Sequence, residues 1–164
     1  MTDGGLGPDT LTALFARPVV GRLATLDPDG YPAIVPVWFE WDGSAAWIVA
    51  RARSRYVDDI RRDARVALSV VDPDDPDVRV HVRGRAEIVA GPGPLEGETL
   101  ALARRLAERH EGAPGLDYIE TSRSWPRCLI RIAPDRLTSW GSPDWHPRYM
   151  DPRTDPDPGP GGSR

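Results

Sequence analysis

The sequence predicts a mainly β protein of the α+β class, in which six to seven antiparallel strands form a small closed or partly open barrel with flanking helices. Two observations support this fold class. Short apolar stretches follow one another along the chain, and tight-turn residues separate them. The predicted order is helix, three strands, helix, two strands, helix and two strands, which has too few crossover helices for parallel βαβ units.

The first half of the chain predicts a short helix and a three-stranded meander. The helix begins at Pro8 and stops before Pro18, because a residue that precedes proline is disfavoured in a helix. The strands, rich in β-branched and aliphatic residues, span 19–26, 31–41 and 45–52. The turns between them are Asp27-Pro28-Asp29-Gly30 and Asp42-Gly43.

The second half alternates helices with pairs of strands. Ser54 suits the N-cap of a helix that runs to about Asp63. Strands at 65–71 and 78–89 flank an acidic, proline-rich loop. An amphipathic helix follows at 94–111, with Pro94 in its first turn and Gly112 after its end. The last strands span 127–133 and 136–140, separated by Pro134-Asp135.

The strand at 78–89 has one apolar and one polar face. The apolar face consists of Val78, Val80, Val82, Ala86 and Ile88, and the polar face of Arg79, His81, Arg83, Arg85 and Glu87. Such a basic face is usually solvated, although it can also line a cleft for an acidic ligand.

Length and charge set the class of protein. The chain of 164 residues fits one domain over residues 8–149, and we expect the glycine-rich start (1–7) and the Pro/Gly/Asp-rich tail (150–164) to be disordered. A net charge of −4 argues against a nucleic-acid partner. The first residues show no basic start and no apolar stretch, so we expect no signal peptide, and no stretch approaches the roughly 20 apolar residues of a membrane helix. We therefore expect a cytoplasmic protein with no membrane partner.

Several residue types are missing or rare. The sequence contains no Lys, Asn or Gln, so Schiff-base and P-loop lysine chemistry is excluded and anion binding falls to arginine. This composition also indicates a GC-rich genome. The single cysteine, Cys128, excludes an intrachain disulfide, and the histidines show no metal-ligand spacing, so we expect no metal. No nucleophile–base pair is visible, and the catalytic residues stay unknown.

The segment Arg51-Ala52-Arg53-Ser54-Arg55 predicts an anion-binding corner. It leads from a strand into a helix N-terminus, where free backbone N–H groups and the helix dipole favour an anion. Arginines beside such a terminus make a plausible pocket for phosphate or carboxylate. The alternative is a solvated strand end.

Pro32 and Pro36 lie inside an apolar strand. Because proline cannot donate to a strand ladder, this strand is predicted at a sheet edge or at a bulge. The resulting gap leaves backbone groups free for a flat heterocycle beside Val37 and Trp38. The alternative is an edge protected against aggregation.

Large aromatic residues gather late in the chain. They fit a dimer interface better than stacking on a ring ligand, although both interpretations are open. The group comprises Trp125, Trp140, Trp145 and Tyr149, with His146 and Arg148 among them.

Five segments, in order, resemble the pyridoxamine phosphate oxidase-like family of split β-barrel flavin and deazaflavin reductases. The likeness extends from residue 9 to about 140. The matching segments are Gly21–Pro32 ("LAT-x-x-x-x-G-x-P"), Pro36–Phe39 ("P-V-W-F"), Ser54–Val66 ("S-R-K…L-R-R-D-P-R-V"), Gly84–Glu87 ("G-x-A-x") and Arg131–Leu137 ("R-I-x-P-x-R-V").

This resemblance implies an FMN-binding split-barrel fold and a homodimer with cofactors at the subunit interface. It implies that the cofactor phosphate lies at Arg53, Ser54, Arg55 and Tyr56, and that the ring lies along Val35, Pro36, Val37 and Trp38. Tyr56 replaces the family's usual lysine, so one phosphate contact is lost unless Arg51, Arg53 or Arg55 replaces it.

The resemblance points to the branch of oxidoreductases that use coenzyme F420, a deazaflavin common in actinobacteria. The implied reaction is hydride transfer between the reduced deazaflavin and an unsaturated C=C or C=N bond of a small molecule. Water or an unplaced residue would deliver the proton, with His81 a weak candidate. The alternatives are an FMN-dependent oxidoreductase and a non-catalytic flavin-, deazaflavin- or haem-binding protein.

Overall fold

The computed structural model describes residues 5–141. Residues 1–4 and 142–164 lie outside this range, so the structure does not test the expected disorder of the tail. Four members of the late aromatic group also lie outside the described residues, namely Trp145, His146, Arg148 and Tyr149.

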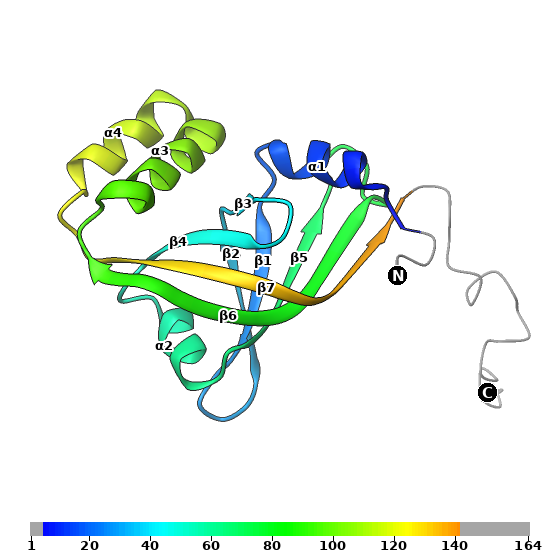
Figure 1. Ribbon diagram of the computed structural model, residues 1–164, viewed down its shortest axis with the longest axis horizontal. Coiled ribbons are helices and arrows are strands. Elements are labelled where there is room, and N and C mark those ends of the chain that lie inside the picture. The colour runs from blue at the N-terminus through cyan, green and yellow to red at the C-terminus, as the bar shows by residue number, and fades with distance from the viewer. Residues whose placement is uncertain (1–4, 142–164) are drawn as a thin grey trace, which may run out of the picture.

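Seven antiparallel strands form one sheet, in the order β2-β1-β5-β6-β7-β4-β3, and four helices flank it (Figure 1). This confirms the predicted class and strand count. The strands are β1 (Gly21–Leu26), β2 (Pro32–Val37), β3 (Glu40–Trp41), β4 (Ala46–Arg51), β5 (Arg65–Val71), β6 (Arg79–Gly93) and β7 (Arg127–Trp140). The helices are α1 (Pro8–Ala16), α2 (Arg55–Arg62), α3 (Gly97–Glu111) and α4 (Ala113–Thr121).

The sheet closes at Trp38 and Phe39. These two residues join β2 to β3, although the two strands lie at opposite edges of the sheet. A two-residue connection can span opposite edges only if the sheet curls into a barrel. The prediction of one continuous strand over 31–41 is therefore wrong, because the chain crosses the barrel seam at this point. The edge position predicted from Pro32 and Pro36 is confirmed for β2.

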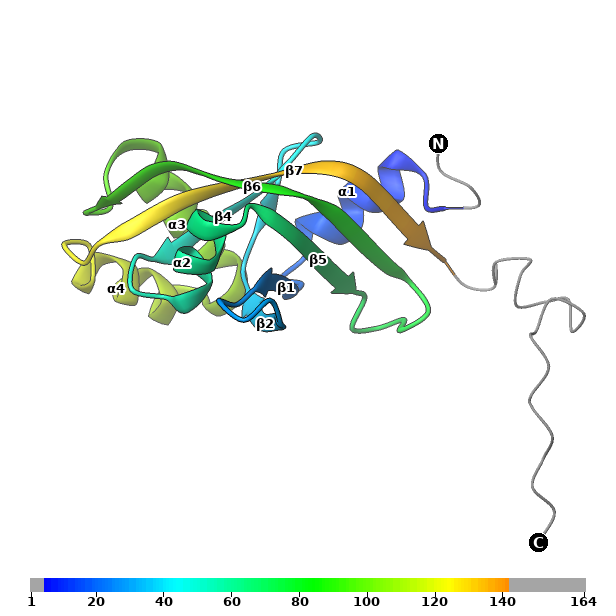
Figure 2. The ribbon, with the colours of Figure 1, turned by 90° about the horizontal axis from the view of Figure 1, so that it is seen from below.

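The last strand pair was also predicted wrongly. Residues 127–140 form one strand, β7, that pairs with β6 along nearly its whole length and is the long strand beside it in Figure 2. Pro134 lies opposite Gly84, next to a register shift between Arg83 and Gly84. A β-bulge accommodates a residue that cannot donate to the ladder, so the proline does not end the strand.

The region between β6 and β7 contains two helices rather than one. β6 runs on to Gly93 and α3 begins at Gly97, so Pro94 precedes the helix. Gly112, with φ of 65°, ends α3, and α4 starts directly after it. At the neck of this insertion, Leu95 N–H donates to the carbonyl of Arg123 at 2.8 Å. The helical pair stands at one end of the molecule, apart from α1 (Figure 1).

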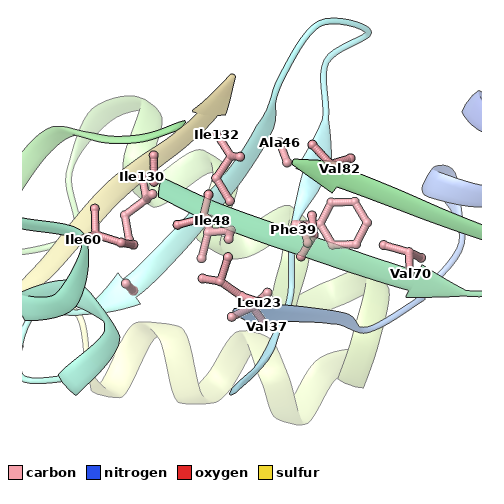
Figure 3. Packing of buried hydrophobic residues seen from close by; sticks show 14 of the residues in the cluster. Leu23, Val37, Phe39, Ala46, Ile48, Ile60, Val70, Val82, Ile130 and Ile132 are labelled. Carbon is pink, nitrogen blue, oxygen red and sulfur yellow. The ribbon is translucent and has the colours of Figure 1, made fainter. Parts of the chain in front are cut away.

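The barrel interior is apolar and almost fully buried. Leu23, Phe39, Ile48, Ile130 and Ile132 meet there from three strands and the seam (Figure 3). A second cluster lies beneath the helical pair, where Trp38 and Val49 pack against residues of α3 and α4.

A buried polar contact fixes α2 against the barrel. The hydroxyl of Thr25 in β1 donates to the carboxylate of Asp59 at 2.9 Å, and Arg62 pairs with the same carboxylate at 2.8 Å. Thr25 and Asp59 are only 2% and 5% exposed. This contact anchors the middle of α2 to β1.

Candidate functional site

A cavity of about 590 Å³ lies between the sheet and the helical pair. Its size matches the usual range for small-molecule sites. Lining residues on the sheet side and at the start of α2 are Val20, Pro36, Val37, Trp38, Ile48, Val49, Arg51, Ser54, Tyr56 and Arg127. Those from α3 and α4 are Ala103, Leu106, Glu111, Tyr118 and Ile119.

The cavity brings together the two segments that sequence reasoning had singled out separately. Pro36, Val37 and Trp38 line it from the end of β2, and Arg51, Ser54 and Tyr56 line it from the end of β4 and the start of α2. Val35, Arg53 and Arg55 are not among the lining residues.

Arg127 is the main lining residue that sequence reasoning missed. It lies opposite Arg51 in the pairing of β4 with β7, and its side chain is only 5% exposed. Its guanidinium donates to Tyr118 Oη at 3.2 Å, to Ser122 Oγ at 3.1 Å and to the carbonyl of Trp125 at 3.4 Å. All three acceptors are neutral. Arg127 reaches the cavity because β7 pairs with β4, and the sequence alone does not show which strands pair.

The charge of Arg127 is therefore not balanced by an acid among residues 5–141. Burial lowers the pKa of Arg127, and the neighbouring Arg51 and Arg53 lower it further, while Tyr118 opposes the shift. Arg51 also donates to Tyr118 Oη, at 2.6 Å, and makes no ion pair in the described part of the chain. A buried cation without a counter-charge is costly, and a bound anion relieves that cost.

The N-terminus of α2 adds backbone donors to this corner. Ser54 occupies the N-cap position as predicted, but its side chain makes no capping hydrogen bond. The first N–H groups of the helix therefore have no acceptor from the Ser54 side chain. Burial raises the pKa of the Tyr56 phenol, and Ser54 opposes this shift. The donor set at this corner fits a phosphate group.

An adjoining cavity of about 380 Å³ shares two walls with the first. Arg51 and Arg127 line both cavities, and Arg53 and Trp125 line only the second. Tyr118 and Trp125 meet edge to face, with ring centroids 6.3 Å apart. Trp140 lies at the far end of β7, so Trp125 and Trp140 belong to different surfaces.

His81, the weak candidate for proton delivery, is not among the residues that line either cavity. Its ring contacts Trp140 edge-on at 4.9 Å, and burial together with Arg79 lowers its pKa. Within residues 5–141, no group of three His, Cys, Asp or Glu side chains could hold a metal ion.

The geometry can be compared with known proteins at this point. The family model of pyridoxamine 5'-phosphate oxidase matches residues 8–141. The chain belongs to this family. A solved F420 reductase is 30% identical to the chain, covers 76% of it and 93% of its own length, and superposes with a TM-score of 0.61. Split-barrel architecture is thus a property that the chain shares with the family.

Two further solved structures extend the comparison. A conserved hypothetical protein from Mycobacterium tuberculosis is 28% identical, with a TM-score of 0.68 over 85% of this chain and 88% of the other. A heme storage protein from Vibrio cholerae is 16% identical, with a TM-score of 0.62 over 81% and 94% of the chains, and shows the fold alone. Among curated proteins, none is similar enough to count as a match. No described helix has the length and apolar character needed to cross a membrane.

Proposed function

We propose that this member of the pyridoxamine 5'-phosphate oxidase family is an oxidoreductase that uses coenzyme F420 and an unsaturated small molecule as substrate. The observation that carries the proposal is Arg127, a buried arginine with no acid partner among residues 5–141, at the edge of a largely apolar cavity. A flavin-type cofactor has the matching chemistry, because it combines a flat apolar ring with a phosphate. The 30% identity to an F420 reductase favours the deazaflavin over FMN.

The residues divide the work by chemistry. Arg51, Arg127, Ser54 and the first N–H groups of α2 would hold the phosphate. Val37, Trp38 and the neighbouring apolar residues of β4 would enclose the ring and exclude water. Tyr56, in place of the family lysine, would offer a neutral donor at this corner. When bound, the cofactor supplies the hydride, and the protein supplies binding, orientation and electrostatics.

A second copy of the chain is part of the proposal. Val20, which lines the cavity, is 41% exposed, and Ile34 and Tyr31, farther along the β1–β2 hairpin at the sheet edge, are 68% and 72% exposed. Several exposed apolar residues along one edge hairpin are typical of an interface. We therefore propose a homodimer with the cofactor at the subunit interface.

The main alternatives use the same cavity. FMN carries a similar ring and phosphate, and the protein could hold either cofactor without turnover. Haem is less well matched, since the lining residues include no histidine, cysteine or methionine and leave only Tyr56 and Tyr118 as ligands for iron.

The test is titration of the purified protein with FMN, riboflavin, coenzyme F420 and haem, followed by visible absorbance and fluorescence. We expect F420 and FMN to bind, and riboflavin, which lacks the phosphate, to bind at least about tenfold more weakly than FMN. Single-turnover mixing with enones should then oxidise reduced F420 faster than buffer does. Equal affinity for FMN and riboflavin would contradict the phosphate corner, and binding without accelerated oxidation would favour a carrier.

A further inference from the structure

Trp38 lies at the seam of the barrel and is supported by His110 of α3. The two rings are parallel, with centroids 4.8 Å apart and planes inclined by 9°. Trp38 lines the cavity, whereas His110 is not among the lining residues. The imidazole thus stacks on one face of the indole without itself lining the cavity.

Ion pairs fix the last turns of α3 against the same short connection. Arg105 and Arg109 both donate to the carboxylate of Glu40, through Nη2 atoms at 2.7 and 3.1 Å. Glu40 follows Trp38 by two residues, and Arg109 directly precedes His110. Two ion pairs and one stack therefore hold α3 in register with the seam.

The contribution of His110 is its flat face. Its Nε2 atom is buried and has no hydrogen-bond partner within the described chain. The imidazole thus offers the surrounding residues no hydrogen bond through this atom. Without the imidazole stacked on it, the indole of Trp38, which directly follows the edge strand β2, could occupy other staggered rotamers.

We propose that His110 is a positioning residue for the cofactor ring, because it holds the Trp38 indole in place as a wall of the cavity. The inference rests on the proposed function, since it requires a flat ring to bind against that wall. It goes further by assigning a role to a residue outside the cavity and by making the last turn of α3 part of the ring site.

The experiment compares His110→Leu, His110→Phe and the wild type by FMN titration, with the visible circular dichroism of bound FMN as the second readout. His81→Leu is the matched control, because it removes a histidine–tryptophan contact that lies outside the cavity. Competition by inorganic phosphate reports the anion corner separately. If His110→Leu does not fold, His110→Gln replaces it as the variant without an aromatic ring.

We expect His110→Leu to weaken FMN binding about five- to tenfold and to alter the visible circular dichroism of the bound ring. His110→Phe should restore both, and phosphate competition should not change. In a Trp38→Leu background, His110→Leu should cause no further loss, as expected for a residue that acts through Trp38.

The outcomes separate the two proposals. If the wild type binds FMN and His110→Leu binds it with the same affinity and the same visible circular dichroism, the role of His110 is overturned and the proposed function stays intact. An equal loss in the Trp38→Leu background, or failure of His110→Phe to restore binding, overturns it as well. A wild-type protein that binds neither FMN nor F420 overturns the proposed function and this inference with it.

Discussion

Arg51 and Arg127 lie directly opposite each other on β4 and β7, and both guanidinium groups donate to the hydroxyl of Tyr118. Like charges at opposed positions of a sheet repel each other. Tyr118, from α4, is a shared neutral acceptor and cannot cancel the two charges. The pair thus lowers the stability of the fold, and an anion between the two groups removes that disadvantage. Stability and binding should therefore respond in opposite directions to changes at this pair.

Tyr118→Phe removes the shared acceptor. We expect the free energy of unfolding to fall by about 1–2 kcal/mol, because a buried charged donor loses a partner. Saturating FMN should recover part of the loss, since the phosphate offers new acceptors. Urea unfolding with and without FMN measures both quantities. Identical losses in the two conditions would contradict an anion at this corner.

Arg127→Met should separate binding from stability. Replacing a buried charge by an apolar side chain of similar length is often neutral or stabilising, so the free energy of unfolding should change by no more than about 1 kcal/mol or should increase. The affinity for FMN should fall by about 10- to 100-fold, while riboflavin binding stays unchanged. Arg136→Met, at an exposed position, is the control. A parallel loss of riboflavin binding would point to a damaged cavity rather than to a lost phosphate contact.

Gly84→Ala should destabilise the barrel. A Cβ at this position would lie 2.0 Å from the carbonyl oxygen of Ala133, and backbone atoms cannot yield as a flexible side chain can. We expect a loss of about 3 kcal/mol in the free energy of unfolding. Gly93→Ala is the matched control on the same strand, because a Cβ there meets no atom within 4 Å. Equal stability of the two variants would rule out close approach at the bulge.

Asp42 should contribute stability that is lost in acid. Although partial burial opposes it, hydrogen bonds from Trp47, Ser44 and Ala45 lower the pKa of Asp42 to about 2. A carboxylate with a depressed pKa stabilises the fold above its ordinary pKa and loses this contribution as the pH falls towards 2.

Asp42→Asn tests this pH dependence. At pH 7 it should cost about 1 kcal/mol, allowing for solvent screening of an exposed carboxylate, and the difference from wild type should shrink between pH 4 and about pH 2. Urea unfolding at pH 7, 5 and 3 provides the comparison, and Asp135→Asn is the exposed control. A difference that is constant with pH would assign the effect to turn geometry alone.

Features that depend on neighbouring residues were predictable from the sequence. Pro32 and Pro36 place β2 at an edge because the missing N–H group is a property of the residue itself. The same holds for the Ser54 N-cap position and for the alternation of β6. The link between the β2 segment and the arginine segment was only implied by resemblance, and the structure brings both to one cavity.

Features that depend on closure of the barrel or on contacts between distant segments were not predictable from the sequence. The seam at Trp38 interrupts a stretch whose local pattern is that of one strand, and Arg127 gains its setting only through pairing with β4. In helix α4, Pro114 lies in the first turn, where proline is tolerated, but Gly115 disfavours helix locally. Gly115 packs where a Cβ would lie 2.6 Å from the carbonyl oxygen of Ala107, so contact with α3 compensates for low helix propensity.

The position of α3 and α4 also bears on how such proteins can diverge. Both helices lie between two strands that already pair with each other down to Gly93 and Arg127, so the barrel is complete beneath them. Residues 94–126 can therefore change as a unit during evolution, which replaces about a third of the cavity lining while the scaffold and the arginine pair stay in place. Relatives with the same barrel and a different segment between β6 and β7 should bind ligands of different shape.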